Sequence, residues 1–310
     1  MAALLASDSF DIRSGAATEG SPYMRTIKTM NREMTGKVCI VTGANAGIGK
    51  ETALGLAKLG ATIVMICRDR DRGEAAQREI KQRSGNDTVE LMICDLASQK
   101  SIEQFANEFK QHYDRLDVLV NNAGVLMRER SLTEDGIEST FAINHLGYFL
   151  MTNLLLDVLK RGATARIVNV ASTAHKYGKI DISGWVIGRD YSAFGAYANS
   201  KLANVLFTYE LARRLEGTGV TANCLHPGAV GTNLFRGLPK LLQALIALVT
   251  MGSERGARTS IYLASSPEVE GVSGKYFARR RLEKSSDASY DRDAARQLWD
   301  VSEELTGLNT

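Results

Sequence analysis

The stretch KVCIVTGANAGIG, residues 37–49, decides the fold of this chain. It begins with an apolar run of the length expected for a strand in a parallel sheet, and three glycines follow. Residues 50–59 then show the periodicity of a helix. Glycines between a strand and a helix allow a tight turn and let the backbone approach a pyrophosphate at the helix N-terminus. The stretch therefore predicts a dinucleotide-binding βαβ unit, and an ordinary glycine turn is the alternative.

The rest of the chain continues the alternation of strand and helix. Apolar runs typical of buried strands cover residues 61–67, 89–94, 118–120, 166–170 and 220–225. Helical periodicity lies between them, with two long helices predicted over residues 138–159 and 197–215. Strands joined by helices pair in parallel through right-handed crossovers. We therefore expect an α/β fold, a single-domain doubly wound (Rossmann) parallel sheet with helices on both faces.

The domain boundaries follow from where this pattern begins. Residues 1–34 show no strong periodicity and include a piece rich in Ser, Gly and Ala, so we expect an N-terminal extension there. Residues 35–310 contain neither a linker nor an internal repeat, and we assign them to one domain.

Composition narrows the functional class. The 310 residues are 44% hydrophobic with a formal net charge of +3, which argues against a disordered, fibrous or membrane-embedded chain and against a nucleic acid partner. The four cysteines and the scattered histidines lack metal-ligand spacing, so we expect buried thiols in a reducing compartment and no metal. We find no secretory signal pattern and no spanning apolar stretch, and we expect a cytoplasmic protein.

The end of the second predicted strand indicates which dinucleotide binds. An acidic residue about 20 residues after the glycines binds the ribose 2′-hydroxyl of NAD. This chain has Arg68 there, followed by Asp69. A guanidinium pairs with a 2′-phosphate through two hydrogen bonds, as no carboxylate can, so we predict NADP(H). The alternative is an Arg68 in solvent with Asp69 reaching the ribose.

Tyr197 and Lys201 are candidates for acid–base chemistry. They are four residues apart at the start of a predicted helix, which places them on one face, a turn apart. A tyrosine alone has a pKa of about 10 and is a poor proton carrier. A neighbouring ammonium stabilises the phenolate, so the pair can exchange a proton with an alcohol or carbonyl oxygen near neutral pH.

Taken together, these features resemble the short-chain dehydrogenase/reductase superfamily from about residue 36 to the C-terminus. The resemblance rests on motifs in the family's order: the glycine stretch, NNAG at residues 121–124, Asn144, Ser172, Tyr197 with Lys201, and Pro227-Gly228 with Thr232.

The resemblance implies a role for each catalytic candidate. Tyr197 would be the general acid in reduction and the general base in oxidation, and Ser172 would hydrogen-bond and orient the substrate oxygen. Lys201 would bind the nicotinamide ribose and lower the pKa of the phenol. Asn144 would hold a water that relays protons between Lys201 and solvent. Thr173 is the alternative to Ser172, because the family often has a serine pair at this place.

The resemblance also implies the cofactor contacts. Asp95 would accept a hydrogen bond from the adenine amino group, and Asn121 with Gly124 would shape the adenosine side of the pocket. Thr232 and the backbone after Pro227 would fix the carboxamide. The full predicted set of cofactor-binding residues is Gly43, Asn45, Gly47, Ile48, Gly49, Arg68, Asp95, Leu96, Asn122, Ala123, Gly124, Tyr197, Lys201, Pro227, Gly228 and Thr232.

Longer stretches are similar to the NADP-preferring retinol dehydrogenase branch of that family. The similarity is in TGANAGIGKET at residues 42–52, CRD at 67–69, NHLG at 144–147, SKLAN at 200–204 and LWDVS at 298–302. This branch interconverts retinoids and other lipophilic carbonyl compounds. Its membrane-bound members have an N-terminal hydrophobic anchor, which we do not expect here. The resemblance therefore implies a lipophilic substrate without assigning a retinoid.

The segment after Thr232 is the candidate substrate lid, at about residues 233–255. It is rich in leucine, isoleucine and valine, which suits a hydrophobic substrate or a membrane surface. The alternative is a core or dimer helix. Trp185 and Tyr191 are candidates for the rim of the substrate cleft, with an ordinary surface loop as the alternative.

We therefore predict an NADP(H)-dependent short-chain alcohol dehydrogenase/carbonyl reductase. It would interconvert an alcohol and a carbonyl compound, either a lipophilic aldehyde, a ketone or a retinoid-like molecule. Alternatives are a reductase of steroid, polyketide or quinone-like carbonyls and, in another class, a non-catalytic NADP-binding protein. The expected partners are a small lipophilic substrate and further copies of this chain, with peripheral membrane contact left open.

Overall fold

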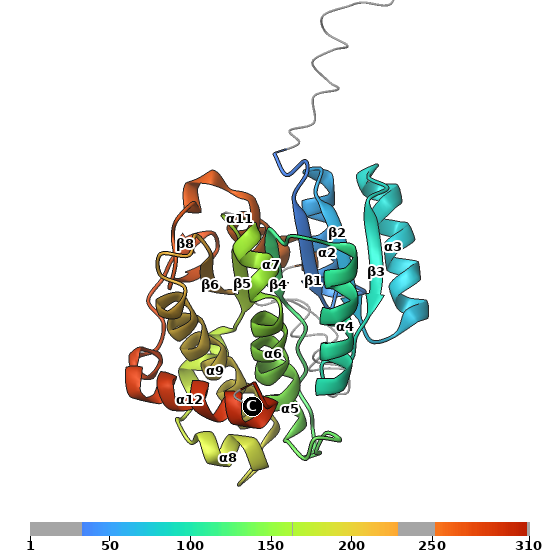
Figure 1. Ribbon diagram of the computed structural model, residues 1–310. Coiled ribbons are helices and arrows are strands. Elements are labelled where there is room, and N and C mark those ends of the chain that lie inside the picture. The colour runs from blue at the N-terminus through green and yellow to red at the C-terminus, as the bar shows by residue number, and fades with distance from the viewer. Residues whose placement is uncertain (1–32, 163, 229–251, 309–310) are drawn as a thin grey trace, which may run out of the picture. The chain divides into compact units, whose positions relative to one another are not determined.

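An eight-stranded sheet forms the centre of the computed structural model, which describes residues 33–162, 164–228 and 252–308 (Figure 1). The strands are β1 (Val38–Thr42), β2 (Thr62–Cys67), β3 (Val89–Ile93), β4 (Val118–Asn121), β5 (Arg166–Val170), β6 (Thr221–His226), β7 (Tyr276–Ala278) and β8 (Arg281–Leu282). They lie in the order β3-β2-β1-β4-β5-β6-β7-β8. All neighbours are parallel except β7 and β8. The doubly wound Rossmann fold is thus confirmed, with one unpredicted antiparallel strand at the edge.

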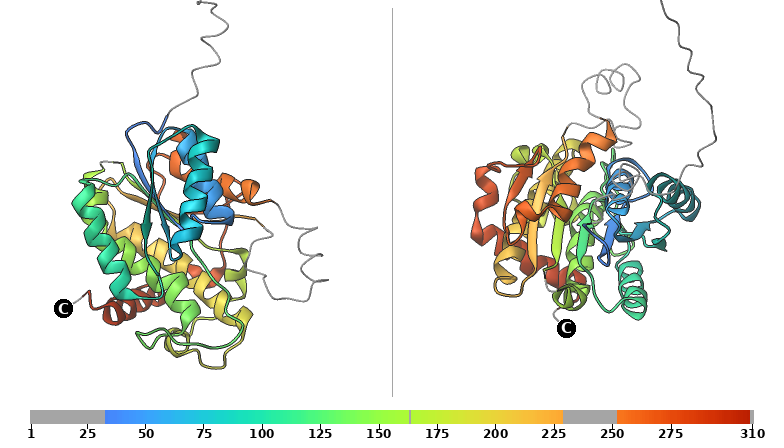
Figure 2. Two further views of the ribbon diagram at one scale, coloured as in Figure 1. Left: turned by 90° about the vertical axis from the view of Figure 1, so that its right-hand side faces the viewer. Right: turned by 90° about the horizontal axis from the view of Figure 1, so that it is seen from above.

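Helices cover both faces of this sheet (Figure 2). One face packs against α2 (Gly47–Lys58), α3 (Arg70–Ser84) and α11 (Ser253–Ser265). The other packs against α4 (Gln99–His112), α6 (Gly147–Leu154), α7 (Leu156–Arg161), α9 (Ala193–Arg214) and α12 (Arg292–Thr306). The remaining short elements are α5 (Ser139–Phe141), η1 (Ala142–Leu146), η2 (Thr173–Tyr177), α8 (Ile182–Ile187), η4 (Pro267–Val269) and η5 (Asp287–Tyr290).

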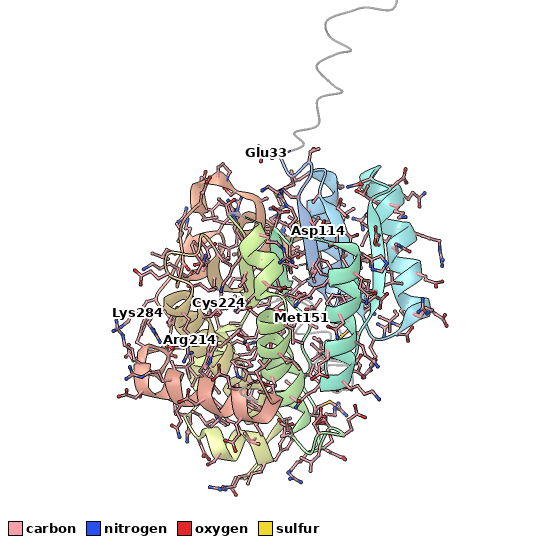
Figure 3. The ribbon with its side chains drawn as sticks, in the orientation of Figure 1. Glu33, Asp114, Met151, Arg214, Cys224 and Lys284 are labelled. Atoms are coloured by element: carbon pink, nitrogen blue, oxygen red, sulfur yellow. The ribbon has the colours of Figure 1, made fainter. Side chains whose placement is uncertain are left out.

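The three-layer arrangement explains why the strands are apolar throughout, because both faces of the sheet are buried. Successive residues of a strand point to opposite faces, and β1 shows the result. Ile40 packs into the cluster with α4, α6 and α9, whereas Cys39 and Val41 pack into the cluster with α2, α3 and α11. Buried side chains such as Met151 and Cys224 lie between the layers, and Lys284 extends into solvent (Figure 3).

The long helix predicted over residues 138–159 is interrupted, which corrects that prediction. The structure has α5, then the π-helix η1, then α6 and α7. A π-helical turn inserts an extra residue into a helix and occurs often at functional sites. Asn144 lies at the centre of η1. The apolar pattern could not reveal this turn, because buried residues continue through it.

Four further sequence expectations concern the cysteines, metal sites, membrane-spanning helices and the substrate lid. The thiols Cys39, Cys67, Cys94 and Cys224 are free and buried, as predicted. Within the described ranges, no group of three or more His, Cys, Asp or Glu side chains could hold a metal ion. None of the helices in the described part of the chain is both long and apolar enough to cross a bilayer. Thr232 and most of the predicted lid, residues 233–251, lie outside the described residues.

Candidate active site and cofactor cleft

A cleft of about 780 Å³ opens at the carboxyl ends of the central strands, where doubly wound sheets bind their ligands. It extends from the turn after β1, past the ends of β2, β3 and β4, to the start of α9. The predicted site residues that line it are Gly43, Asn45, Gly47, Ile48, Gly49, Arg68, Asp95, Leu96, Asn122, Ala123, Gly124, Ser172, Thr173, Tyr197, Lys201, Pro227 and Gly228. The chain therefore brings distant motifs to one surface.

The turn after β1 is shaped for close approach of a ligand. Gly43 and Gly47 have φ angles of 68° and 57°, a left-handed backbone that favours glycine. A Cβ on Gly49 would lie 2.4 Å from the Gly43 carbonyl oxygen and 2.5 Å from Asn122 Nδ2, so a larger residue does not fit. Among the described residues, no side chain caps α2 at Ala46, and its first turn has no acidic residue. Its N–H groups thus remain available to an anion, which fits a dinucleotide pyrophosphate.

Thr42 and Asn122 join the ends of β1 and β4 beneath this turn. Asn122 Nδ2 donates to the Thr42 carbonyl oxygen at 2.8 Å. The Thr42 hydroxyl accepts hydrogen bonds from the backbone N–H groups of Asn122 at 2.8 Å and Ala123 at 3.0 Å. The loop after β4 is therefore held directly against the glycine turn.

Asn121 does not have the role that the resemblance implied. Its side chain is fully buried and donates to Thr152 Oγ1 at 3.0 Å and to Asn169 Oδ1 at 2.9 Å. It does not line the cleft. The prediction that Asn121 shapes the adenosine side was wrong, because alternate residues of β4 and its loop face opposite directions and Asn121 faces a helix layer.

The ends of β2 and β3 bring charged groups to the cleft. The Arg68 side chain is 73% exposed, and its guanidinium lies 3.9 Å from the carboxylate of Asp95. Asp69 caps α3, because its Oδ1 accepts the backbone N–H of Arg72 at 3.0 Å. Arg72, in the first turn of α3, also lines the cleft and was not predicted.

Tyr197, Lys201 and Ser172 meet at the inner end of the cleft. Lys201 Nζ lies 5.7 Å from the centre of the Tyr197 ring and donates to the Val170 carbonyl oxygen at 2.9 Å. Ser172 is the second residue after β5 and caps the short helix η2, where its hydroxyl accepts the N–H of Ala174 at 3.2 Å. The three side chains come from two elements and face one space, as the motif order predicted.

Burial governs the proton affinities of these groups. It raises the pKa of Tyr197 to about 12, although a hydrogen bond with Ser172 acts to lower it. It also lowers the pKa of Lys201 to about 7. Tyr197 is thus a neutral phenol at physiological pH, the state that a proton donor needs. The expected lowering of the Tyr197 pKa by Lys201 does not occur in this geometry, because burial disfavours the ammonium itself.

Asn144 lies completely buried behind the cleft rather than in its lining. Its amide oxygen accepts the N–H of Val125 at 2.8 Å. Its amide nitrogen donates to the Val125 carbonyl oxygen at 2.9 Å and to Ser200 Oγ at 3.0 Å. A Cβ on Gly124 would lie 3.4 Å from both Asn144 Oδ1 and Lys201 Nζ. Asn144 therefore joins the loop after β4 to α9 beside Lys201.

Sequence reasoning missed Tyr148 and misplaced the rim of the cleft. The Tyr148 ring is buried with its centre 5.7 Å from Lys201 Nζ, and its hydroxyl donates to the Ala123 carbonyl oxygen at 2.7 Å. Its position four residues after Asn144 is the helical spacing that could have shown it.

Trp185 and Tyr191 do not line the cleft, so the prediction that they form its rim was wrong. Trp185 is buried and donates its indole N–H to the Lys179 carbonyl oxygen at 3.0 Å. The Tyr191 hydroxyl donates to the Met127 carbonyl oxygen at 2.7 Å. Trp185 thus joins two parts of the segment between Ser172 and Tyr197, and Tyr191 joins that segment to the loop after β4.

Comparison with known proteins agrees with this architecture. A family model described as short chain dehydrogenase matches residues 37–241. Retinol dehydrogenase 14 from Homo sapiens is 48% identical over 294 residues, which cover 89% of this chain and 88% of that protein. Retinol dehydrogenase 13 from Homo sapiens is 46% identical over 283 residues, covering 88% of this chain and 85% of that protein.

Two solved structures extend the comparison. An uncharacterized protein from Mycobacterium paratuberculosis has a TM-score of 0.72 and 36% identity, covering 88% of this chain and 94% of its own. Pseudomonas aeruginosa RhlG, solved as an NADP active-site complex, has a TM-score of 0.64 and 26% identity, covering 80% of this chain and 96% of its own. The chain belongs to the short-chain dehydrogenase/reductase family of nicotinamide-dependent alcohol/carbonyl oxidoreductases, and within it resembles the retinol dehydrogenases.

Proposed function

We propose that the protein is an NADP(H)-dependent alcohol dehydrogenase/carbonyl reductase acting on lipophilic aldehydes, ketones or retinoid-like molecules. The observation that carries this proposal is the convergence of Ser172, Tyr197 and Lys201 at one end of the cleft that begins at the glycine turn. A protein that only senses the cofactor needs the glycine turn but has no use for these three groups in one place.

NADP(H) is favoured by the charges at the end of β2. Arg68 and Arg72 both line the cleft there, so two guanidinium groups can pair with a 2′-phosphate. Asp69 already uses one carboxylate oxygen as the cap of α3, which leaves it less suited to bind a ribose hydroxyl. The relative solved as an NADP complex supports the same assignment.

The chemistry of carbonyl reduction follows from the positions of three side chains. Bound NADPH would supply a hydride to the carbonyl carbon. Ser172 would donate a hydrogen bond to the carbonyl oxygen, and Tyr197 would give its phenolic proton to that oxygen as negative charge develops there. Lys201, held by the Val170 carbonyl oxygen, would bind the ribose beside the phenol.

The substrate class is inferred from the relatives. Two proteins that share nearly half of this sequence are retinol dehydrogenases, and retinol is a lipophilic alcohol. We therefore place the physiological substrate among lipophilic alcohols and carbonyl compounds.

The test is NADPH oxidation with a panel of aldehydes from propanal to retinal, with NADH in parallel and Tyr197→Phe as the control. We expect turnover to prefer NADPH and to fall by about 10³-fold in the variant, the range lost with a general acid. The variant should retain its affinity for NADPH, because the ring still fills its place. NADPH binding by the wild type without turnover of any aldehyde would favour the non-catalytic binding protein.

A further inference from the structure

Two aromatic side chains are exposed at the mouth of the cleft. Tyr177 is 71% exposed and Phe194 is 54% exposed, although both line the cleft. Their ring centres are 5.8 Å apart and their planes are inclined by 57°. Large aromatic side chains are mostly buried in folded proteins. Those that stay exposed often contact an apolar ligand or partner. An exposed pair inside a ligand cleft therefore points to an apolar ligand.

Both aromatics belong to the elements that carry the catalytic hydroxyls. Phe194 is three residues before Tyr197 on α9, so the two side chains share a face one turn apart. Tyr177 is the last residue of η2, which begins directly after Ser172. A carbonyl oxygen bound between Ser172 and Tyr197 would thus have Phe194 about one helical turn away, and Tyr177 at the far end of η2, about 10 Å along that helix.

The backbone that carries Tyr177 is fixed against α9. A Cβ on Gly178 would lie 2.9 Å from the Ala198 carbonyl oxygen, so the absence of a side chain lets the chain pass close to the helix. The backbone N–H of Lys179 donates to Asn199 Oδ1 at 3.0 Å. The exposed ring is therefore held in place by packing of its neighbours rather than by burial of its own surface.

We propose that Tyr177 and Phe194 form an aromatic subsite that binds the hydrocarbon chain of long-chain or polyene aldehydes and alcohols. This inference rests on the function proposed above and assigns the residues that select its lipophilic substrate. Rings with centres 5.8 Å apart leave no space for a chain between them, so the chain lies across both rings. The affinity comes from removing the apolar surfaces of rings and chain from water together.

The experiment measures kcat and KM for propanal, hexanal, decanal and retinal with NADPH. The wild type is compared with Phe194→Ala, with Phe194→Leu, and with the double variant Tyr177→Ala/Phe194→Ala. Leu282→Ala is the matched control, because Leu282 is 61% exposed on β8 and does not line the cleft. The Tm of each variant checks that the fold is intact. Its affinity for NADPH checks the cofactor end of the cleft, which is the part around the glycine turn.

We expect kcat/KM of the wild type to rise with chain length. The double variant should lose this rise, with kcat/KM for decanal reduced about tenfold or more, mainly through KM, and propanal affected least. Phe194→Leu should keep more of the chain-length dependence than Phe194→Ala, and Leu282→Ala should keep all of it.

Two results would overturn the subsite while the proposed function stands. One is an unchanged chain-length dependence in the double variant, and the other is an equal loss for propanal and decanal, which indicates general damage. A wild type that oxidises NADPH with none of the aldehydes would instead refute the proposed function, and the subsite with it.

Discussion

The two ends of the cleft are built in different ways. At the cofactor end, the glycine turn presents backbone groups beside the charged side chains of Arg68 and Asp95, and Gly49 has neighbours so close that only glycine fits. At the substrate end, exposed side chains form the surface, and Tyr177 and Phe194 meet solvent while packed backbone holds them. The first end requires particular residues, whereas the second requires only large apolar ones. We infer from this difference that cofactor binding would be the rigid part of the proposed site and substrate choice the adjustable part.

The largest effect is expected from Gly49→Ala. A Cβ would lie 2.4 Å from the Gly43 carbonyl oxygen, so the turn must shift. Overpacking of this kind costs about 1–3 kcal/mol, and we expect the Kd for NADPH to rise about 100-fold. Isothermal titration calorimetry measures it, with Gly252→Ala as the control because a Cβ on Gly252 meets no atom of the described residues within 4 Å. An unchanged Kd would contradict the rigid cofactor end.

A smaller effect is expected from the double variant Arg68→Ala/Arg72→Ala. Loss of charge-assisted hydrogen bonds to a 2′-phosphate should raise KM for NADPH about tenfold or more and leave KM for NADH nearly unchanged. Steady-state kinetics with both cofactors give the ratio. Arg78→Ala on the same helix is the control, because Arg78 is 72% exposed and does not line the cleft. Equal changes for both cofactors would remove the NADP(H) assignment.

Gly178→Ala applies the same substitution to the substrate end. Its Cβ would lie 2.9 Å from the Ala198 carbonyl oxygen, so the chain carrying Tyr177 must move away from α9. We expect KM for decanal to rise about threefold to tenfold while the Kd for NADPH stays at the wild-type value. A change in NADPH affinity as large as that of Gly49→Ala would show that the two ends are not independent.

A last effect, on stability rather than on ligand affinity, concerns its dependence on pH. Burial lowers the pKa of Lys201 from 10.5 to about 7 in the folded protein, so the unfolded chain binds the extra proton between these values. The free energy of unfolding should therefore rise with pH from about 7 toward about 10 through this group. Denaturant titrations of the cofactor-free protein should show a flatter dependence for Lys201→Met. The same slope in both proteins would show that Lys201 is not desolvated.

Much of the cofactor end was predictable from the sequence. The glycine turn demands glycine at fixed positions, so local spacing was enough to find it, and the same holds for Tyr197 and Lys201 on one helix face at the inner end of the cleft. The substrate end was not predictable in this way. Trp185 and Tyr177 are both large aromatics in the same segment, yet one is buried and the other is 71% exposed. Nothing in the residue types or their spacing predicts which of the two is exposed.

Two further features depended on contacts between distant parts of the chain. Asn144 lies in a π-helical turn, and its side-chain amide forms hydrogen bonds with Val125 and Ser200. The local apolar pattern predicts none of these contacts. Asn121 and Asn122 are neighbours in one motif, but only the second reaches the cleft.

The sequence by itself determined the alternating α/β fold, the glycine turn and the residues of the proton-transfer group. These are properties of local spacing, since strand and helix periods and the steric freedom of glycine act over a few residues. Only the tertiary structure decided that the Tyr197 pKa rises to about 12 and that Phe194 stays exposed beside Tyr177. Burial and exposure are set by which surfaces pack together, and residues far apart in the chain supply those surfaces.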